Sequence, residues 1–245
     1  MGMYSEFAEL YDELMDDVDY ARETEKYLSM LRSVCPAARE LCDCATGTGK
    51  MAIGFAKRGM KVIASDLSQE MLRVAQKNAM KAGFPVRFIA QDMCSVSLPH
   101  RVDAVTACCD GVNYLLTEEK LALFLRSAFD ALKPGGALLF DISSYDKLAH
   151  TLGDRFYGED RDDVTYLWQN SWNEKERCVT MDLSFFVKLP DGLYRRFEEE
   201  HIQRAWLPDE ITGAIAQAGF TGIQTDLTGR DRQYFMAVRP LQEGR

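Results

Sequence analysis

Residues 43–49 (Asp-Cys-Ala-Thr-Gly-Thr-Gly) place a carboxylate next to closely spaced glycines, between an apolar run and a helical pattern. Glycine lets the backbone turn tightly and approach a ligand, and the first turn of a following helix offers free N–H groups to an anion. The spacing Gly47-x-Gly49-x-x-Ala52 also matches the dinucleotide fingerprint G-x-G-x-x-G/A. These residues predict a site for a nucleotide-like cofactor.

Two more aspartates follow the next two apolar runs of the sequence. Asp66 comes 19 residues after Gly47 and can accept hydrogen bonds from both ribose hydroxyls of an adenosine-containing cofactor. Asp92 is a further acceptor, suited to an adenine amino group. Because the carboxyl ends of parallel strands meet at one edge of a sheet, we expect Asp43, Asp66 and Asp92 to line one crevice.

Two other kinds of nucleotide site were weighed against this pattern. A P-loop needs Ser or Thr where Met51 stands and glycine where Cys44 stands, so the pattern argues against it. An NAD(P)-dependent oxidoreductase remains an alternative, although the chain has no Tyr-x-x-x-Lys pair and no second nucleotide-binding half.

The elements that must position these residues alternate between strands and helices. Apolar strands separated by helices of about 10–15 residues are typical of a doubly wound α/β fold, with helices on both faces of a mostly parallel sheet. Helix signals support this: Ser68 and Thr117 stand at N-cap positions, and Gly59 follows a helix end. We expect seven strands, over residues 40–45, 61–66, 86–92, 102–109, 137–142, 222–227 and 233–239.

A different pattern occupies residues 144–207. Three long strands are predicted at 165–172, 177–189 and 193–207, joined by short turns into an antiparallel meander. We expect this insertion to form a β lid, and residues 1–143 and 208–245 to form the core with its N-terminal helices. The charges around Glu198–Glu200 are interpreted as the solvated side of a lid strand.

Composition limits the function further. The 245 residues carry 29 Lys and Arg against 38 Asp and Glu, a net charge of −9, and 47% are hydrophobic, as in ordinary globular proteins. The seven cysteines include no Cys-x-x-Cys motif, which favours reduced thiols and no metal site. No apolar run approaches the ~18 residues of a membrane span, and the acidic start differs from a signal peptide, so we expect a cytoplasmic protein. The acidic balance argues against nucleic acid as a partner, and both a monomer and a homodimer remain open.

Several motifs together resemble the class I S-adenosylmethionine-dependent methyltransferases. Residues 43–49 resemble that family's acidic-x-Gly-x-Gly-x-Gly signature, with Ala45 in place of the first glycine. Two further segments resemble the family's second and third motifs, namely Asp66–Leu72 and Gln91–Met93, and Cys109–Leu115 resembles the motif that faces the transferred methyl group. The N-terminal Phe-Ala-x-x-Tyr-Asp of residues 7–12 looks most like a bacterial small-molecule subgroup that includes sugar N-methyltransferases.

The resemblance implies a Rossmann-like enzyme that transfers the methyl group of S-adenosylmethionine to a small-molecule acceptor by in-line displacement. Asp110 is then the candidate general base, with Asn113 and Tyr114 as groups that orient the acceptor. A non-catalytic S-adenosylmethionine-binding protein is the remaining alternative. The residues that the resemblance places around the cofactor are Tyr4, Tyr11 and Tyr20 as closing groups, Ala45, Thr46 and Gly47 at the methionyl moiety, Asp66 at the ribose, Leu67, Met71, Gln91, Asp92 and Met93 around the adenine, and the backbone of Cys109.

Overall fold

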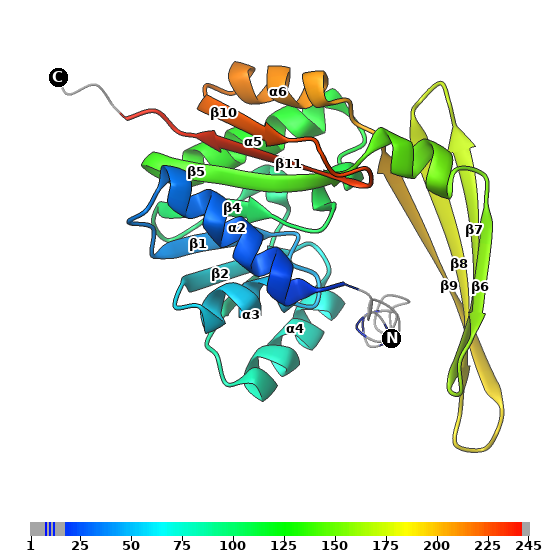
Figure 1. The fold of residues 1–245 in the computed structure, drawn as a ribbon. Coiled ribbons are helices and arrows are strands. Elements are labelled where there is room, and N and C mark those ends of the chain that lie inside the picture. The colour runs from blue at the N-terminus through cyan, green and yellow to red at the C-terminus, as the bar shows by residue number, and fades with distance from the viewer. Residues whose placement is uncertain (1–7, 9, 11, 13–17, 242–245) are drawn as a thin grey trace.

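Two sheets organise the chain in this computed structural model, which describes residues 8, 10, 12 and 18–241 (Figure 1). The central sheet has seven strands in the order β10-β11-β5-β4-β1-β2-β3, and a second sheet has four in the order β6-β7-β8-β9. The central strands are β1 (Glu40–Cys44), β2 (Lys61–Asp66), β3 (Arg87–Ala90), β4 (Val102–Ala107), β5 (Leu132–Ser143), β10 (Thr221–Asp226) and β11 (Arg232–Val238).

The central sheet is parallel except at one side. Strands β1 to β5 pair in parallel, whereas β11 is antiparallel to both β5 and β10. The predicted doubly wound fold with seven mostly parallel strands is therefore confirmed. The register sets Asp43 beside Ala64 of β2 and Thr106 of β4, so the carboxyl ends of these strands share one edge.

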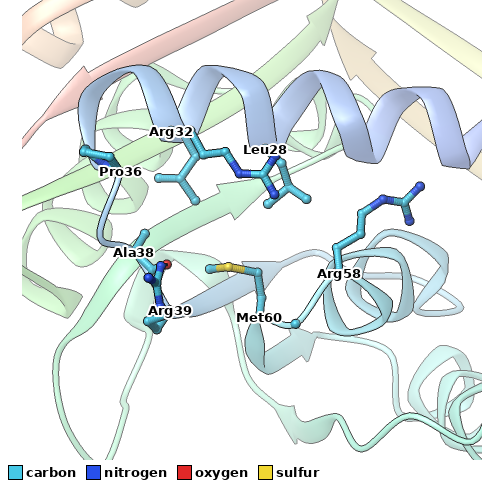
Figure 2. A pocket seen from close by; sticks show the side chains of 9 residues that line it. Leu28, Arg32, Pro36, Ala38, Arg39, Arg58 and Met60 are labelled. Carbon is cyan, nitrogen blue, oxygen red and sulfur yellow. The ribbon is translucent and has the colours of Figure 1, made fainter.

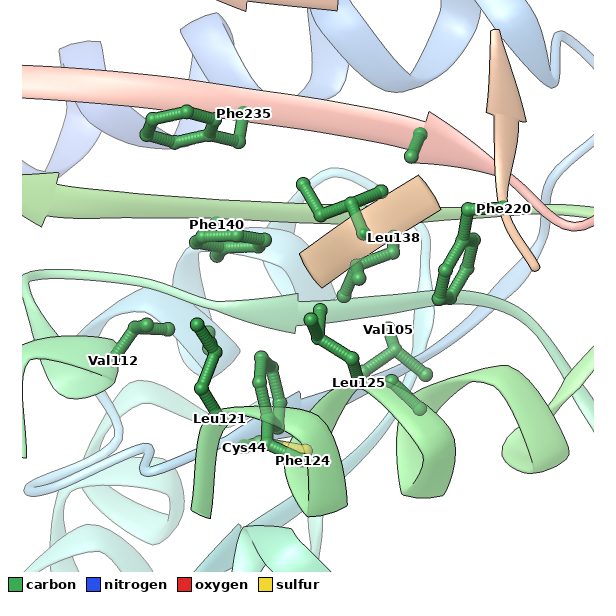
Figure 3. Close-up of a cluster of buried hydrophobic side chains, with 14 of the residues drawn as sticks. Cys44, Val105, Val112, Leu121, Phe124, Leu125, Leu138, Phe140, Phe220 and Phe235 are labelled. Carbon is green, nitrogen blue, oxygen red and sulfur yellow. The ribbon is translucent and has the colours of Figure 1, made fainter. Parts of the chain in front are cut away.

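Helices cover both faces of this sheet. On one face, α2 (Tyr20–Val34) and α3 (Lys50–Lys57) bury Tyr27 and Phe55 in an apolar cluster with strand residues such as Leu139. On the other, α5 (Glu118–Ala131) and α6 (Pro208–Gln217) pack against β4, β5 and β11. Figure 3 shows this second cluster, in which Phe124 lies near Phe140. The sheet edge is thus held between two packed layers.

The predicted N-cap residues of two helices are confirmed. Ser68 accepts a hydrogen bond from the Met71 amide at 3.1 Å and starts α4 (Gln69–Ala82), and Thr117 does the same for Lys120 at 3.3 Å before α5. The start of β5 differs from the expectation, because residues 134–136 belong to the strand. Two backbone hydrogen bonds of 2.8 Å between this stretch and Arg239 extend the sheet pairing.

The second sheet is antiparallel and contains β6 (Phe156–Asp160), β7 (Val164–Asn173), β8 (Cys178–Lys188) and β9 (Tyr194–Arg204). The three long strands and their turns are confirmed, but β6 and the π-helical turn η3 (Lys147–Leu152) were not predicted. Strand β6 is short, contains glycine and pairs only with β7, so it lacks the alternating apolar pattern of a buried strand.

Candidate functional site

The loop after β1 is held on its inner side by hydrogen bonds to the Asp43 carboxylate. This carboxylate is almost fully buried and accepts hydrogen bonds from Thr46 Oγ1 at 2.6 Å and Thr106 Oγ1 at 2.7 Å. Burial raises the pKa of Asp43 to about 6, and the two hydroxyl donors oppose that rise. Asp43 therefore shapes the loop from inside the protein and leaves the outer side of the loop to a ligand.

The glycines of this loop have different surroundings. Both Gly47 and Gly49 have positive φ angles, of 55° and 79°, which glycine adopts without steric cost. A Cβ on Gly49 would lie 3.0 Å from Ala75 Cβ of α4, whereas a Cβ on Gly47 would meet nothing within 4 Å. Gly49 thus allows close packing of two helices, and Gly47 borders the open space in which a cofactor would lie.

Asp66 faces the same space from the end of β2. Its Oδ2 accepts the Gly47 amide at 2.8 Å and its Oδ1 accepts the Ser68 amide at 2.9 Å, which leaves further lone pairs on both oxygens. Burial raises its pKa, and these backbone donors oppose the rise. The adjacent Leu67 is 74% exposed, a large apolar side chain without a protein cover. A diol beside a flat apolar ring, as in adenosine, fits this pair of residues.

The third predicted motif lies at the start of the 3₁₀ turn η1 (Met93–Ser95). Asp92 caps this turn by accepting the Cys94 amide at 2.8 Å, and its other oxygen lies 3.9 Å from Lys120 Nζ. Gln91 Oε1 accepts the Ser97 amide at 3.0 Å, and within the described residues its buried Nε2 has no hydrogen-bond partner. Asp92 Oδ1 thus caps the turn, which leaves Oδ2 available to a ligand such as the predicted adenine amino group.

The loop after β4 is held by a buried carboxylate that the sequence reasoning missed. Cys109 and Asp110 both have φ near 59°, and their amides donate to Asp141 at 2.7 and 3.0 Å. Asp141 is fully buried at the end of β5 and also accepts hydrogen bonds from Tyr27 and Arg232. Burial raises its pKa, and the Arg232 guanidinium opposes this. The only sequence signal was a lone acidic residue in an apolar strand.

The three predicted catalytic residues occupy different environments. Asp110 Oδ1 forms an ion pair with Arg232 at 3.0 Å. Asn113 is fully buried, and its amide group is hydrogen-bonded to the backbone of Ser143 and Arg204, so its predicted role in orienting an acceptor stays a prediction and would act through the position of the surrounding backbone. Both polar atoms of the Asn113 side chain form hydrogen bonds within the protein, and these hold the turn η2 (Gly111–Tyr114) in place.

Tyr114 lies inside the open part of the site. Its side chain is 47% exposed, yet burial among protein atoms raises its pKa, with the Asp110 carboxylate as a further cause and Asp66 as a smaller one. Its hydroxyl is 3.4 Å from His201 Nδ1 of β9. Tyr114 thus lies between the β4 loop and the second sheet.

The N-terminal residues approach the site from another side. Asp12 accepts hydrogen bonds from Thr48 Oγ1 at 2.6 Å and Asn78 Nδ2 at 2.8 Å, and pairs with Lys50 at 3.0 Å. Burial raises the pKa of Tyr20, with smaller contributions from Cys109, Asp12 and Asp110, so the start of α2 also borders the β4 loop. Tyr4 and Tyr11, which were predicted to close the pocket, are outside the described residues.

Strand β9 contributes residues that the sequence reasoning assigned to solvent. Glu199 is only 5% exposed, in contrast to its exposed neighbours Glu198 and Glu200, so the interpretation of the whole run as a solvated face is wrong. On the same face, Gln203 Nε2 lies 3.5 Å from Asp110 Oδ2. Alternation along the strand gives these residues their separate environments, which a count of charges does not reveal.

A separate pocket of about 180 Å³ lies at the amino ends of β1 and β2, opposite the loops described above (Figure 2). Leu28, Met60 and Arg39 are among its lining residues. Arg58 of this pocket is paired with Glu25.

Over residues 8, 10, 12 and 18–241, no group of three or more His, Cys, Asp or Glu side chains is arranged to hold a metal ion. None of the helices in this part of the chain is both long and apolar enough to cross a membrane.

Comparison with known proteins agrees with this geometry. Residues 41–136, which include the glycine loop, Asp66, Asp92 and the β4 loop, match the family described as methyltransferase domain. The chain is 35% identical over 219 residues to the Bacillus subtilis (strain 168) protein named "Putative methyltransferase YqeM", covering 89% of this chain and 86% of the relative.

Two further relatives link the match to cofactor and chemistry. A Clostridium acetobutylicum structure described as an S-adenosylmethionine-dependent methyltransferase superposes with a TM-score of 0.85 at 29% identity, over 98% of this chain and all of the other. A dTDP-3-amino-3,4,6-trideoxy-alpha-D-glucopyranose N,N-dimethyltransferase of Streptomyces venezuelae is 28% identical over 82% of this chain and 83% of the relative. These matches do not support the oxidoreductase alternative, and the chain belongs to the S-adenosylmethionine-dependent methyltransferases.

Proposed function

We propose that this enzyme methylates a small organic molecule held between the carboxyl edge of the central sheet and the β6–β9 sheet. The observation that carries this proposal is the meeting of the two loops: a Cβ on Gly111 would lie 3.0 Å from Ala45 Cβ. The space beside Gly47 and the space beside Tyr114 are therefore adjacent. A methyl donor in the first and an acceptor in the second would be in direct contact.

The residues around the glycine loop fit S-adenosylmethionine. In this proposal Ala45, Thr46 and Gly47 hold the methionyl part, and Asp66 accepts the ribose hydroxyls. The adenine ring lies against Leu67, near Met71 and Met93, with Gln91 and the second oxygen of Asp92 at its polar edge. The backbone of Cys109 faces the cofactor beside Tyr20.

The bound cofactor supplies an electrophilic methyl group on a sulfonium, and the protein's main task is to align the acceptor with it. Collinear positioning at ~3 Å contact supplies several kcal/mol of the barrier without a strong acid or base. Tyr114 and the Oδ2 atom of Asp110 face the acceptor in this proposal, and Oδ2 accepts a proton that the acceptor loses. Asn113 contributes by holding η2.

The remaining structural proposals concern the second sheet and the location of the protein. We assign residues 144–207 to a lid over the acceptor, on a core of residues 1–143 and 208–245, because β9 reaches both Asp110 and Tyr114. The seven cysteines form no disulfide, which supports a reducing compartment such as the cytoplasm.

Replacing Asp66 by Ala tests the cofactor site. The variant leaves the ribose hydroxyls without their acceptor, so we expect the binding of S-adenosylhomocysteine to weaken by about 1–3 kcal/mol in calorimetric titration. Half-buried Glu70 in the first turn of α4 provides the control, since Glu70→Ala should leave the affinity unchanged. Equal affinities in both variants would show that the ribose binds elsewhere, and preferential binding of NADH by the wild type would contradict the proposed function.

A further inference from the structure

One face of β9 carries four side chains in alternating positions: Phe197, Glu199, His201 and Gln203. Gln203 lies 3.5 Å from Asp110, and His201 lies 3.4 Å from Tyr114. At the other end, Phe197 belongs to an apolar cluster with Val164 and Phe185, and Leu10 and Met71 pack against that cluster. Glu199 stands between these contacts, so its position along the strand corresponds to the middle of the proposed acceptor space.

Glu199 is buried, and one of its two carboxylate oxygens lacks a partner within the part of the chain that the structure describes. That oxygen is the buried Oε1, and the cross-strand neighbour of Glu199 is Leu183. Burial raises its pKa, and no charge on the described residues opposes this rise. The other titratable side chains on this face are Arg195 and His201 of β9, Tyr166 of β7, and Tyr157 and Glu159 of β6, with Tyr114 and Asp110 across the space.

A buried carboxylate without a partner lowers the stability of the enzyme when no ligand is bound. An ionised carboxylate away from water costs several kcal/mol unless a partner pairs with it. Neighbouring Glu198 shows that the strand can place acidic residues in solvent, since it is exposed and pairs with Arg196. The burial of Glu199 therefore calls for a partner that arrives with a ligand.

The charges of the surrounding space limit the nature of this partner. Asp66 and Asp110 are both close enough to raise the pKa of Tyr114, and the guanidinium of Arg232 is already paired with Asp110 and Asp141. An anionic group would be repelled here, and a neutral hydroxyl would leave the charge of Glu199 uncompensated. A positively charged amino group satisfies both requirements, because it donates hydrogen bonds and neutralises the carboxylate.

We propose that Glu199 binds the ammonium group of the acceptor, which makes it a specificity-determining residue and places the acceptor among the amines. Before methyl transfer this ammonium group gives one proton to Asp110 Oδ2, so that the nitrogen lone pair forms the new bond to the methyl carbon while the bond from that carbon to the donor's sulfur breaks. This inference rests on the proposed function, because it assumes that the acceptor occupies the space between β9 and the β4 loop.

The first test compares Glu199→Gln with Glu198→Gln, a neighbour on the opposite face of the strand. Labelled methyl transfer from S-adenosylmethionine is measured on pairs of compounds with one skeleton, such as glucosamine with glucose and primary alkylamines with the corresponding alcohols. We expect amines to be methylated and alcohols not, with KM for the amine rising at least tenfold in E199Q and unchanged in E198Q. Equal KM values in the two variants, methylation of the alcohols, or a panel without any methylated amine would overturn the inference.

Cofactor binding separates this inference from the proposed function. Calorimetric titration with S-adenosylhomocysteine should give the same affinity in the wild type, E199Q and E198Q. Intact cofactor binding with any of the contrary results above would contradict only the role of Glu199. Loss of cofactor binding in the wild-type protein would instead contradict the proposed function.

Thermal unfolding provides a readout that needs no acceptor. Because the folded-state pKa of Glu199 is raised, the wild type loses stability as pH rises through that pKa, and E199Q is free of this loss. E199Q should therefore melt at a higher temperature than the wild type at pH 7, and the difference should vanish below about pH 4, where the carboxyl is protonated in both the folded and unfolded chain. A lower melting temperature for E199Q at pH 7 would show a structural role and overturn the inference.

Discussion

At the scale of single residues, the two glycines of the 43–49 loop have different roles: Gly49 serves the packing of the fold, and Gly47 borders the proposed binding space. Gly47 borders open space, whereas Gly49 touches Ala75 of α4 and Phe88 of β3. An added methyl group at either position meets the cost of a left-handed backbone, on the order of 1 kcal/mol. Only at Gly49 does it also meet atoms that cannot move without repacking two elements, which adds about 1–3 kcal/mol.

We therefore expect Gly49→Ala to reduce mainly the stability of the protein and Gly47→Ala to reduce mainly its ligand binding. Gly49→Ala should lower the free energy of unfolding more than Gly47→Ala does, as measured by urea titration without ligand. Gly47→Ala should keep most of the stability and weaken the binding of S-adenosylhomocysteine, because its methyl group occupies the cofactor space. The assignment of the open side of the loop would be wrong if Gly47→Ala bound the ligand as tightly as the wild type.

At the scale of elements, Asp141 joins parts of the chain that are far apart in sequence. Its carboxylate binds Tyr27 of α2, Arg232 of β11 and the amides of Cys109 and Asp110 after β4. The turn that carries Asp110 has two consecutive non-glycine residues with positive φ, a conformation that the surrounding contacts must stabilise. Asp141 provides two of those contacts.

Substitution of Asp141 should affect both the sheet and this turn. In Asp141→Asn the amide cannot accept all four donors, and Arg232 loses a buried partner, so we expect destabilisation of about 3–5 kcal/mol in urea unfolding. Tyr27→Phe removes one donor and leaves the ion pair intact, so it should cost about 0.5–1.5 kcal/mol. Similar losses in the two variants would mean that Asp141 does not act as the common anchor of these elements.

The same scale explains how far the sequence could predict the structure. Strands β1, β2 and β4 are short and largely buried, with mostly apolar residues, and Ser68 and Thr117 are local capping signals, so both kinds of feature could be predicted from neighbouring residues. The ion pair of Asp110 with Arg232 joins residues 122 positions apart and depends on the order of the strands. Burial of Glu199 depends on which face of β9 turns toward the core, and no residue near it in sequence carries that information.

At the scale of the whole molecule, the N-terminal residues connect the central sheet with the second sheet. Leu10 packs against the Val164, Phe185 and Phe197 cluster of β7–β9. Two positions later, Asp12 binds Thr48 and Lys50 beside the glycine loop. A contact that spans both sheets should respond to cofactor binding, because the loop to which Asp12 is bound is the loop that we propose as the contact of the cofactor.

The variant Asp12→Ala tests this connection, with Asp19→Ala as its control. Asp12 accepts three donors at the glycine loop and α4, whereas Asp19 only caps α2 by accepting the Arg22 amide. Loss of the Asp12 contacts should weaken S-adenosylhomocysteine binding by about 1–2 kcal/mol in calorimetric titration. Asp19→Ala should reduce stability by about 1 kcal/mol through the lost cap while keeping the affinity. Equal effects of the two variants on affinity would indicate that the N-terminal residues stabilise the fold without any coupling to the cofactor, because only Asp12 reaches the loop.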